Sequence, residues 1–217
     1  MSAHRLLYLI RHGRADYASK EFSRTPRGLT YDPPLDETGR EQAQLLARRL
    51  VLLDPQPAVV ACSPLRRARE TVAPYAERAG IEVVVDDDLA EAFIGEWEHL
   101  SFEELLATDE EIVERLRNQQ AIWQHAPGGE RLPEFRERVG RAVDRAIEAG
   151  ADGDVLVVAH GVVINAFVGP LLGVDHEMFF LPENTSVNSV IVEAGRRRVR
   201  FLNDVLHLSD PHLFPGD

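Results

Sequence analysis

The sequence predicts an α/β fold with a mostly parallel sheet and helices on both of its faces. Short apolar runs alternate with helical patterns along most of the 217 residues, which is typical of such a sheet. Two of these runs end in polar residues, the first in RHG at 11–13 and a later one in His160-Gly161. Because the carboxyl ends of parallel strands meet at one edge of a sheet, we expect these residues to form a site there.

The predicted strands are the apolar runs of the sequence. They lie at residues 5–10, 58–62, 82–85 and 154–159, with a late strand pair at 186–193 and 198–202 placed at the sheet edge.

Two capping signals predict where helices begin. Thr38 and Glu41 have the spacing of a capping box. Ser63 followed by Pro64 is typical of an N-cap and the first helical residue, and Gly80 predicts the end of that helix. A longer amphipathic pattern predicts a helix from Leu132 to Gly150.

The length is typical of a single domain, here spanning residues 1–217. Two segments interrupt its alternating pattern. Residues 14–35 are polar and rich in turn formers, which predicts a long surface loop that selects the substrate. Residues 93–130 are acidic and irregularly helical, and we expect them to form an inserted helical lid.

The composition excludes several function classes. The formal net charge of −12 argues against a nucleic-acid-binding protein, which normally carries a basic face. A local arginine cluster still sets the field in its own pocket, because salt screens distant charges over about 8 Å. Cys62 is the only cysteine, so a disulfide within the chain is excluded and an inert buried thiol is expected. No segment has the length of a membrane span, and we expect a cytoplasmic protein.

The RHG sequence carries the chemistry of an anion site. His12 has a side chain that is nucleophilic near neutral pH, whereas a serine needs a base. Arg11 offers forked donors to phosphate oxygens, and Gly13 allows close approach of the backbone. The tripeptide alone would also fit an ordinary surface histidine after a strand.

Two further positions remain alternatives on spacing alone. Arg66 and Arg67 lie early in the same predicted helix and point about 100 degrees apart, and either could pair with Glu70 instead of an anion. His160 could equally be a satisfied core histidine. The proton donor of the site is Glu91, Glu96 or Glu98, three carboxylates in one short stretch.

The sequence predicts neither a metal nor a cofactor. It has no cysteine pair and no Walker-type glycine loop. The remaining histidines are scattered without ligand spacing: His4, His99, His125, His176, His207 and His212.

Several ordered motifs together resemble the histidine phosphatase superfamily, whose members are phosphoglycerate mutase-like enzymes. They are LIRHG at 9–13, PLDETGREQA at 34–43, SPLRRARET at 63–71, LAEAFIGEWEH at 89–99, VVAHGVVIN at 157–165 and ENTSVNSV at 183–190. The resemblance implies a three-layer sandwich of the phosphoglycerate mutase type.

The resemblance also implies roles for individual residues. His12 corresponds to the histidine that becomes phosphorylated, and Glu91 to the proton donor. Arg11, Arg67 and His160 correspond to the phosphate pocket, and the family pattern selects Arg67 over Arg66.

The sequence differs from the family pattern near the expected substrate. Arg14 and Ala15 follow RHG where members often have Glu or Gln and then Thr or Ser, and His99 stands where WEG has its glycine. Ala18 stands near the place of an asparagine typical of mutases, and the C-terminal motifs are similar to the phosphatase branch. These differences concern substrate choice.

We therefore expect a metal-independent phosphomonoesterase, a histidine phosphatase of the acid type, acting on a small phosphorylated metabolite. Gly13, Gly161, Arg14 and Arg27 are further expected substrate-binding residues, the two arginines meeting a second anionic group of the substrate if the loop is more than solvated. A phosphoglycerate mutase and an inactive phosphate- or protein-binding module are the alternatives. We expect no nucleic-acid or membrane partner and leave a homodimer open.

Overall fold

The computed structural model describes residues 4–214 except 109, 119 and 121–122. Within these residues, six strands form one sheet in the order β5–β4–β6–β1–β7–β8. The strands are β1 (Arg5–Arg11), β4 (Val59–Cys62), β5 (Val83–Val85), β6 (Val155–Ala159), β7 (Val187–Glu193) and β8 (Arg196–Asp204). The first four run parallel, whereas β7 and β8 join antiparallel at one edge. The predicted mostly parallel sheet is therefore confirmed.

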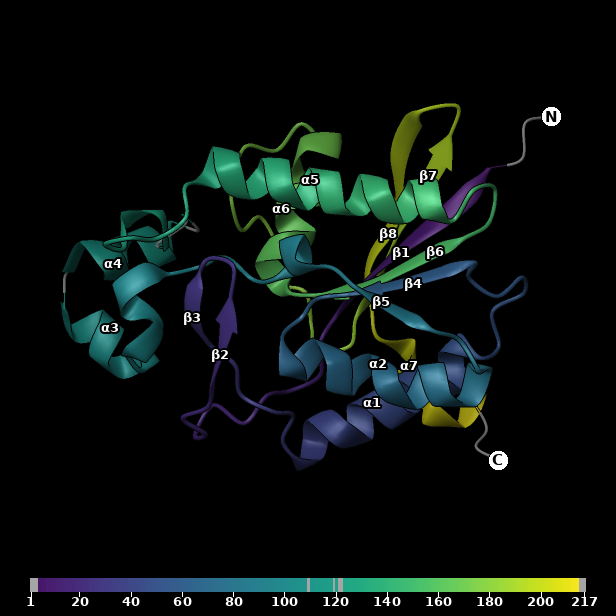
Figure 1. Ribbon diagram of the computed structural model, residues 1–217, viewed down its shortest axis with the longest axis horizontal. Coiled ribbons are helices and arrows are strands. Elements are labelled where there is room, and N and C mark those ends of the chain that lie inside the picture. Colours follow the sequence, from purple (N-terminus) through teal and green to yellow (C-terminus); the bar gives the residue numbers. More distant parts are fainter. Residues whose placement is uncertain (1–3, 109, 119, 121–122, 215–217) are drawn as a thin grey trace.

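Helices cover both faces of this sheet (Figure 1). One face carries α1 (Glu37–Leu50), α2 (Arg66–Ala79) and α7 (Leu206–Ser209), and the other carries α5 (Leu132–Ala149) and α6 (Gly161–Leu171). Successive residues of each strand serve the two faces in turn. Val155 and Val157 pack in the core under α5, whereas Leu156 and Val158 pack in the core under α1 and α2. The central strand β6 is apolar throughout because both of its faces are buried.

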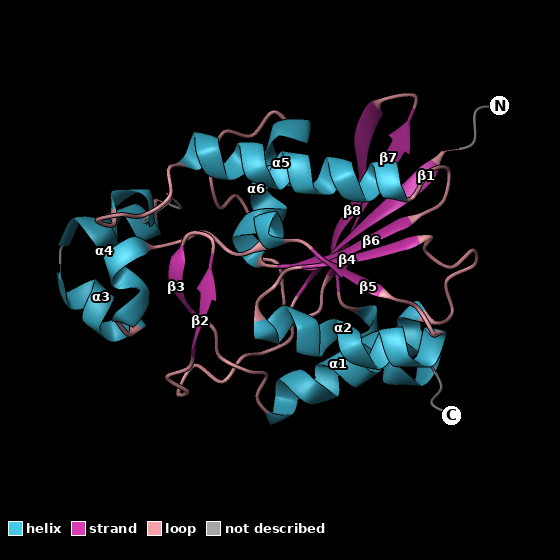
Figure 2. Cartoon of the chain, viewed as in Figure 1, coloured by secondary structure: helices cyan, strands magenta, loops and turns pink. Residues whose placement is uncertain are grey.

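The two segments that interrupt the pattern lie together at one end of the molecule (Figure 2). The segment 14–35 is more ordered than the predicted loop, because it contains an antiparallel hairpin of β2 (Phe22–Thr25) and β3 (Gly28–Tyr31). Gly28 makes its turn with a φ of 145°, a conformation that favours glycine. Beyond the hairpin lie α3 (Phe102–Thr108) and α4 (Glu110–Arg117). Short 3₁₀ helices are η1 (Asp87–Leu89), η2 (Gly95–His99), η3 (Trp123–His125) and η4 (Pro211–Leu213).

The predicted start of α1 is wrong. Asp36 is the N-cap residue, and its carboxylate accepts a hydrogen bond from the amide of Gly39 at 2.7 Å. The hydroxyl of Thr38 instead accepts from the Arg14 guanidinium at 2.8 Å. An aspartate is as good a cap as a threonine, and here it also pairs with Arg14, so the helix begins two residues earlier.

The predicted start of α2 is also wrong, although its end at Gly80 is confirmed. The helix begins at Arg66, with Leu65 at the N-cap position. The amide of Arg66 donates to the carboxylate of Asp32 at 2.7 Å, so a side chain from the hairpin segment takes over the cap. Ser63 lies before the helix, and its hydroxyl accepts from the amide of Leu65 at 3.2 Å and lies 2.7 Å from Nε2 of His160.

Candidate active site

Three residues that follow neighbouring strands meet at one edge of the sheet. His12 follows β1 directly, Ser63 follows β4 and His160 follows β6. The amide of His12 donates to the carbonyl of Ala159 at 3.0 Å, and that of Ser63 donates to Val158 at 2.9 Å, so the strand pairing continues past the strand ends. The ring centroids of the two histidines lie 5.1 Å apart. The predicted meeting of strand ends is present.

His12 is a buried, neutral imidazole whose Nε2 carries no proton. Its Nδ1 lies 2.7 Å from the carbonyl oxygen of Gly13. A carbonyl only accepts hydrogen bonds, so Nδ1 carries the ring proton and Nε2 keeps its lone pair. Burial holds the pKa of His12 well below its usual range, and the charges of Arg67 and Arg11 lower it further.

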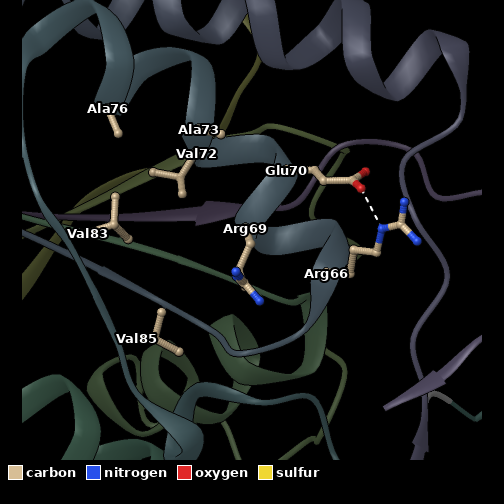
Figure 3. A pocket seen from close by; sticks show the side chains of 8 residues that line it. All are labelled: Arg66, Arg69, Glu70, Val72, Ala73, Ala76, Val83 and Val85. Atoms are coloured by element: carbon tan, nitrogen blue, oxygen red, sulfur yellow. Dashed lines mark hydrogen bonds and ion pairs between the residues drawn. The ribbon is translucent and has the colours of Figure 1, made fainter.

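Arg67 faces this ring, whereas Arg66 does not. The side chain of Arg67 is buried, only 7% of the residue being exposed, and its Nε donates to Nε2 of His12 at 3.4 Å. Arg66 is turned away from the site and pairs with Glu70 (Figure 3) and with Glu21, each at 2.6 Å. Consecutive helical residues differ by about 100 degrees in direction. Arg67 lies on the buried face of α2, which is turned to the strand ends, and Arg66 lies on the exposed face.

Arg11 and His160 each have one side-chain nitrogen in contact with another residue and a second nitrogen without a hydrogen-bond partner among the described residues. Arg11 donates from Nη1 to the carbonyl of Pro182 at 2.5 Å. Nε2 of His160 lies 2.7 Å from Oγ of Ser63. Ser63, predicted to be a helix N-cap, thus contacts His160. Nε of Arg11 and Nδ1 of His160 are buried without a hydrogen-bond partner among the described residues. Buried polar atoms of this kind are rare in native proteins.

Glu91 lies close enough to Arg67 and Arg11 for their charges to affect its pKa. Its carboxylate accepts from the amide of Ala92 at 3.0 Å and from that of Val162 in the first turn of α6 at 3.3 Å. Burial raises the pKa of Glu91, and the two amides together with the charges of Arg67 and Arg11 oppose the rise. The result is a carboxyl group that keeps its proton to higher pH than an exposed glutamate.

The two rival carboxylates have other positions. Glu98 is buried, and both of its oxygens are engaged by backbone amides, that of Tyr31 at 2.7 Å and that of Ile94 at 3.1 Å. It therefore ties the hairpin to the loop that follows Glu91. Glu96 is exposed.

The two glycines of the predicted site differ in their surroundings. A Cβ on Gly13 would lie 2.8 Å from the carbonyl oxygen of Gly39 in α1, so the missing side chain lets the first turn of that helix approach. The amide of Gly13 donates to the Thr71 hydroxyl at 2.9 Å. Gly161 begins α6, and a Cβ there would stand 3.7 Å from Nε of Arg11. Helix packing accounts for Gly13, whereas Gly161 adjoins the site.

The structure does not bring the guanidinium groups of Arg14 and Arg27 to the histidine pair. Arg14, with 55% of its side chain exposed, pairs with Asp36 at 2.5 Å. Arg27 donates to Asp88 at 2.7 Å and lies 3.5 Å from Glu130. Both side chains join structural segments through contacts that the sequence pattern does not reveal.

Several residues at the site carried no role in the sequence analysis. Asn184 donates from its side chain to the carbonyl of His12 at 3.0 Å, and the amide of Thr185 donates to the carbonyl of Arg11 at 3.0 Å. The ENTSV motif that contains both residues was the sequence signal that could have pointed to them. Arg138 binds the backbone carbonyl of Glu91 at 3.1 Å. Its helix carries other arginines that point outward, so only its burial distinguishes it.

Within the described part of residues 4–214, no cluster of three or more histidine, cysteine, aspartate or glutamate side chains could hold a metal ion. In the same part of the chain, no helix combines the length and apolarity needed to cross a membrane. Burial raises the pKa of the Cys62 thiol to about 12, which is consistent with an inert core cysteine.

Comparison with known proteins places this chain in a family. Residues 7–205 match the sequence profile of the histidine phosphatase superfamily (branch 1). Phosphoserine phosphatase 1 of Hydrogenobacter thermophilus is 32% identical over 216 residues, and the alignment covers 94% of this chain and 94% of that protein. Among solved structures, Bacillus stearothermophilus YhfR has a TM-score of 0.80 and 28% identity, covering 94% of this chain and 98% of that one.

A longer relative shares only part of its length with this chain. A bifunctional protein of Mycobacterium tuberculosis is 38% identical over 158 residues, which are 71% of this chain and 40% of that protein. The chain therefore spans well under half of that relative. The match to the family profile, by contrast, extends over nearly the whole sequence, from the first strand of the sheet to the last. The chain belongs to the histidine phosphatase superfamily.

Proposed function

We propose that the chain hydrolyses phosphate monoesters through a phosphohistidine on His12. The observation that carries the proposal is the unprotonated Nε2 of His12. It has no proton because the ring proton is on Nδ1, which donates to the carbonyl of Gly13. Nε2 lies beside the guanidinium of Arg67 at 3.4 Å. A neutral nitrogen nucleophile next to fixed positive charge is suited to attack a phosphorus atom whose oxygens are negative.

The phosphoryl group would bind to donors that have no partner among the described residues. Nε of Arg11 is one of them. The other is Nδ1 of His160, which would be a donor in the tautomer whose Nε2 accepts from the Ser63 hydroxyl, 2.7 Å away. With Arg67, these groups would stabilise the equatorial oxygens in the transition state.

The first step forms a bond from Nε2 of His12 to phosphorus and breaks the bond from phosphorus to the leaving oxygen. That oxygen takes the electron pair of the broken bond, and the protonated carboxyl of Glu91 gives it a proton. The raised pKa of Glu91 favours the protonated form. The Nδ1–H bond to Gly13 remains through the step and stabilises the positive charge on the phosphorylated ring.

The second step returns the enzyme to its starting state. The Glu91 carboxylate takes a proton from water as the water oxygen bonds to phosphorus. The bond from phosphorus to Nε2 breaks, and its electron pair returns to the ring. Inorganic phosphate leaves and Glu91 is again protonated.

We propose further that the segments 14–35 and 93–130 act as a specificity loop and a lid within one domain. They enclose a cavity of about 400 Å³ whose aromatic walls are Tyr17, Phe22 and Tyr31. The carbonyl of Tyr31, a residue of the cavity wall, also accepts from Nη1 of Arg67 at 3.4 Å, which supports a link between this cavity and the proposed phosphate pocket. Small phosphorylated metabolites are the expected substrates, as the name of the phosphoserine phosphatase relative suggests.

Phosphate release from p-nitrophenyl phosphate in excess EDTA tests the proposal. We expect turnover by the wild type and its loss in His12→Ala. Rapid acid-free quenching with labelled substrate should trap an alkali-stable phosphoryl group on the wild type and none on the variant. Turnover retained in His12→Ala would overturn the role of His12. A wild type that transfers phosphoryl groups between phosphoglycerates but not to water would instead be a mutase.

A further inference from the structure

Arg138 uses every hydrogen-bond donor it has in one buried position. It lies on α5, and 3% of its surface is exposed. Nε donates to Glu130 at 2.5 Å, and one N–H of Nη2 donates to the other oxygen of Glu130 at 2.8 Å. The remaining three donors reach backbone carbonyls. Since a guanidinium has five N–H groups, all of them are satisfied.

Those three carbonyls lie on the segment that leads into Glu91. Nη1 donates to Asp88 at 2.6 Å and to Ala90 at 2.7 Å, and Nη2 donates to Glu91 itself at 3.1 Å. The guanidinium thus fixes the backbone up to the residue that bears the carboxyl group. The carboxyl group itself accepts from the amides of Ala92 and Val162.

Glu130 fixes the same segment just beyond Glu91. Its carboxylate accepts from the amide of Phe93 at 3.1 Å, and its own amide donates to the carbonyl of Phe93 at 2.9 Å. Arg27 on the hairpin also reaches this group, at 3.5 Å from Glu130. The Arg138–Glu130 pair therefore holds the chain on both sides of Glu91.

We propose that Arg138 is the positioning residue of the general acid, holding the Glu91 carboxyl within reach of the leaving oxygen. The inference rests on the proposed function, in which Glu91 protonates that oxygen. Arg138 acts only through the backbone and through Glu130, and makes no contact with the substrate.

The geometry requires an arginine. Lysine carries three donors on a single nitrogen, whereas the five bonds of Arg138 diverge from three nitrogens in a plane. Arg138→Lys therefore keeps the positive charge opposite Glu130 but cannot hold three carbonyls and two carboxylate oxygens together. The variant separates the charge of the residue from its geometry.

The test compares two substrates that differ in their need for a proton. The alkoxide released from glycerol 2-phosphate needs protonation as it leaves, whereas the phenolate released from p-nitrophenyl phosphate is stable without it. We expect Arg138→Lys to lower kcat on glycerol 2-phosphate by roughly tenfold or more and kcat on p-nitrophenyl phosphate by less than about threefold. Glu91→Gln should change the same ratio in the same direction.

Arg145→Lys is the matched control. Arg145 lies on the same helix and pairs with the side chains of Asp86 and Asp88 at 2.9 and 2.8 Å, but it holds none of the carbonyls next to Glu91 in the described structure. It should leave the ratio of the two substrates unchanged. In the Glu91→Gln background, Arg138→Lys should add little further change to that ratio, because residues acting as one unit are not additive.

Each outcome separates the inference from the proposed function. If Glu91→Gln shifts the ratio and Arg138→Lys lowers both substrates equally, the positioning role is overturned and the acid role stands. If Glu91→Gln leaves the ratio unchanged, the acid role fails and the positioning role fails with it. Should Arg138→Lys lack a native near-ultraviolet dichroism spectrum, Glu130→Gln carries the same test, because Glu130 orients the guanidinium.

Discussion

Nε of Arg67 points at the one ring nitrogen of His12 that carries no proton, at a distance of 3.4 Å. This contact joins a helix to a strand end across 55 residues of sequence. Burial lowers the pKa of His12, and the positive charge of Arg67 lowers it further, so a second proton on the ring is disfavoured.

Replacing Arg67 tests this relationship directly. We expect Arg67→Lys to lower kcat/KM for phosphate monoesters by about 100-fold, a typical loss when one donor to a transition-state oxygen is removed. Steady-state kinetics with p-nitrophenyl phosphate measures it.

Arg66→Lys is the neighbouring control. The pairs that Arg66 forms with Glu21 and Glu70 are half-exposed, and solvent-exposed ion pairs contribute little to stability. Its activity should stay within a few-fold of the wild type. Equal losses in the two variants would contradict the assignment of Arg67.

The pH dependence of kcat/KM follows from the two shifted groups. In the proposed first step Glu91 is protonated, so we expect the rate to fall as pH rises through its pKa, and burial moves that fall above the range of an exposed carboxyl. His12 must be neutral, so the rate falls as pH drops through its pKa, which burial and Arg67 move well below the usual range.

The alkaline fall is the part to be measured, with glycerol 2-phosphate as substrate. We expect the ratio of wild-type to Glu91→Gln rates to decrease with rising pH, since dividing the two profiles cancels the ionisation of the substrate. A ratio that is flat across the pH range would show that Glu91 does not supply the proton.

The cavity beside Tyr31 predicts a preference for esters with an aromatic group. Tyr17 is 62% exposed and lines this cavity, and an aromatic contact is worth about 0.5–1.5 kcal/mol beyond the area it buries. Tyr17→Ala should therefore raise KM for 1-naphthyl phosphate several-fold and change kcat little. Leu52→Ala, at an exposed leucine just after α1, should change neither constant. A KM unaffected by Tyr17→Ala would exclude this wall from substrate binding.

His207 predicts a loss of stability at acid pH. Its Nε2 lies 3.0 Å from the Thr185 hydroxyl and its Nδ1 lies 3.4 Å from Nη1 of Arg49. Burial, and then the charge of Arg49 against the weaker effect of Asp204, lowers the pKa of His207 from 6.5 to about 4. The unfolded chain therefore binds the proton first, and stability decreases as pH falls from 6.5 towards 4.

Urea unfolding at pH 7 and pH 4.5 measures this effect. We expect the difference in unfolding free energy between the two pH values to be smaller in His207→Gln than in the wild type, by about 2 kcal/mol. His176→Gln replaces an exposed histidine and should keep the wild-type difference. The same difference in all three proteins would mean that His207 does not titrate in this range.

The local sequence patterns were sufficient for the sheet and for the residues at its edge. Strand β6 could be recognised because a strand buried on both faces is apolar throughout. The polar residues that end β1 and β6, His12 and His160, had to meet because parallel strands bring their carboxyl ends to one edge. Family motifs supplied Arg67 and Glu91.

The tertiary structure decided which of several similar groups holds which partner. Asp32 and Asp36 replaced the expected helix caps, Ser63 bonds to His160, and Arg27 joins Glu130. Hydrogen bonds of this kind depend on which segments pack together, and periodicity within one segment carries no record of that packing. A carboxylate or a guanidinium of the right type is therefore visible in the sequence, whereas its burial and its partner arise only when distant segments come into contact.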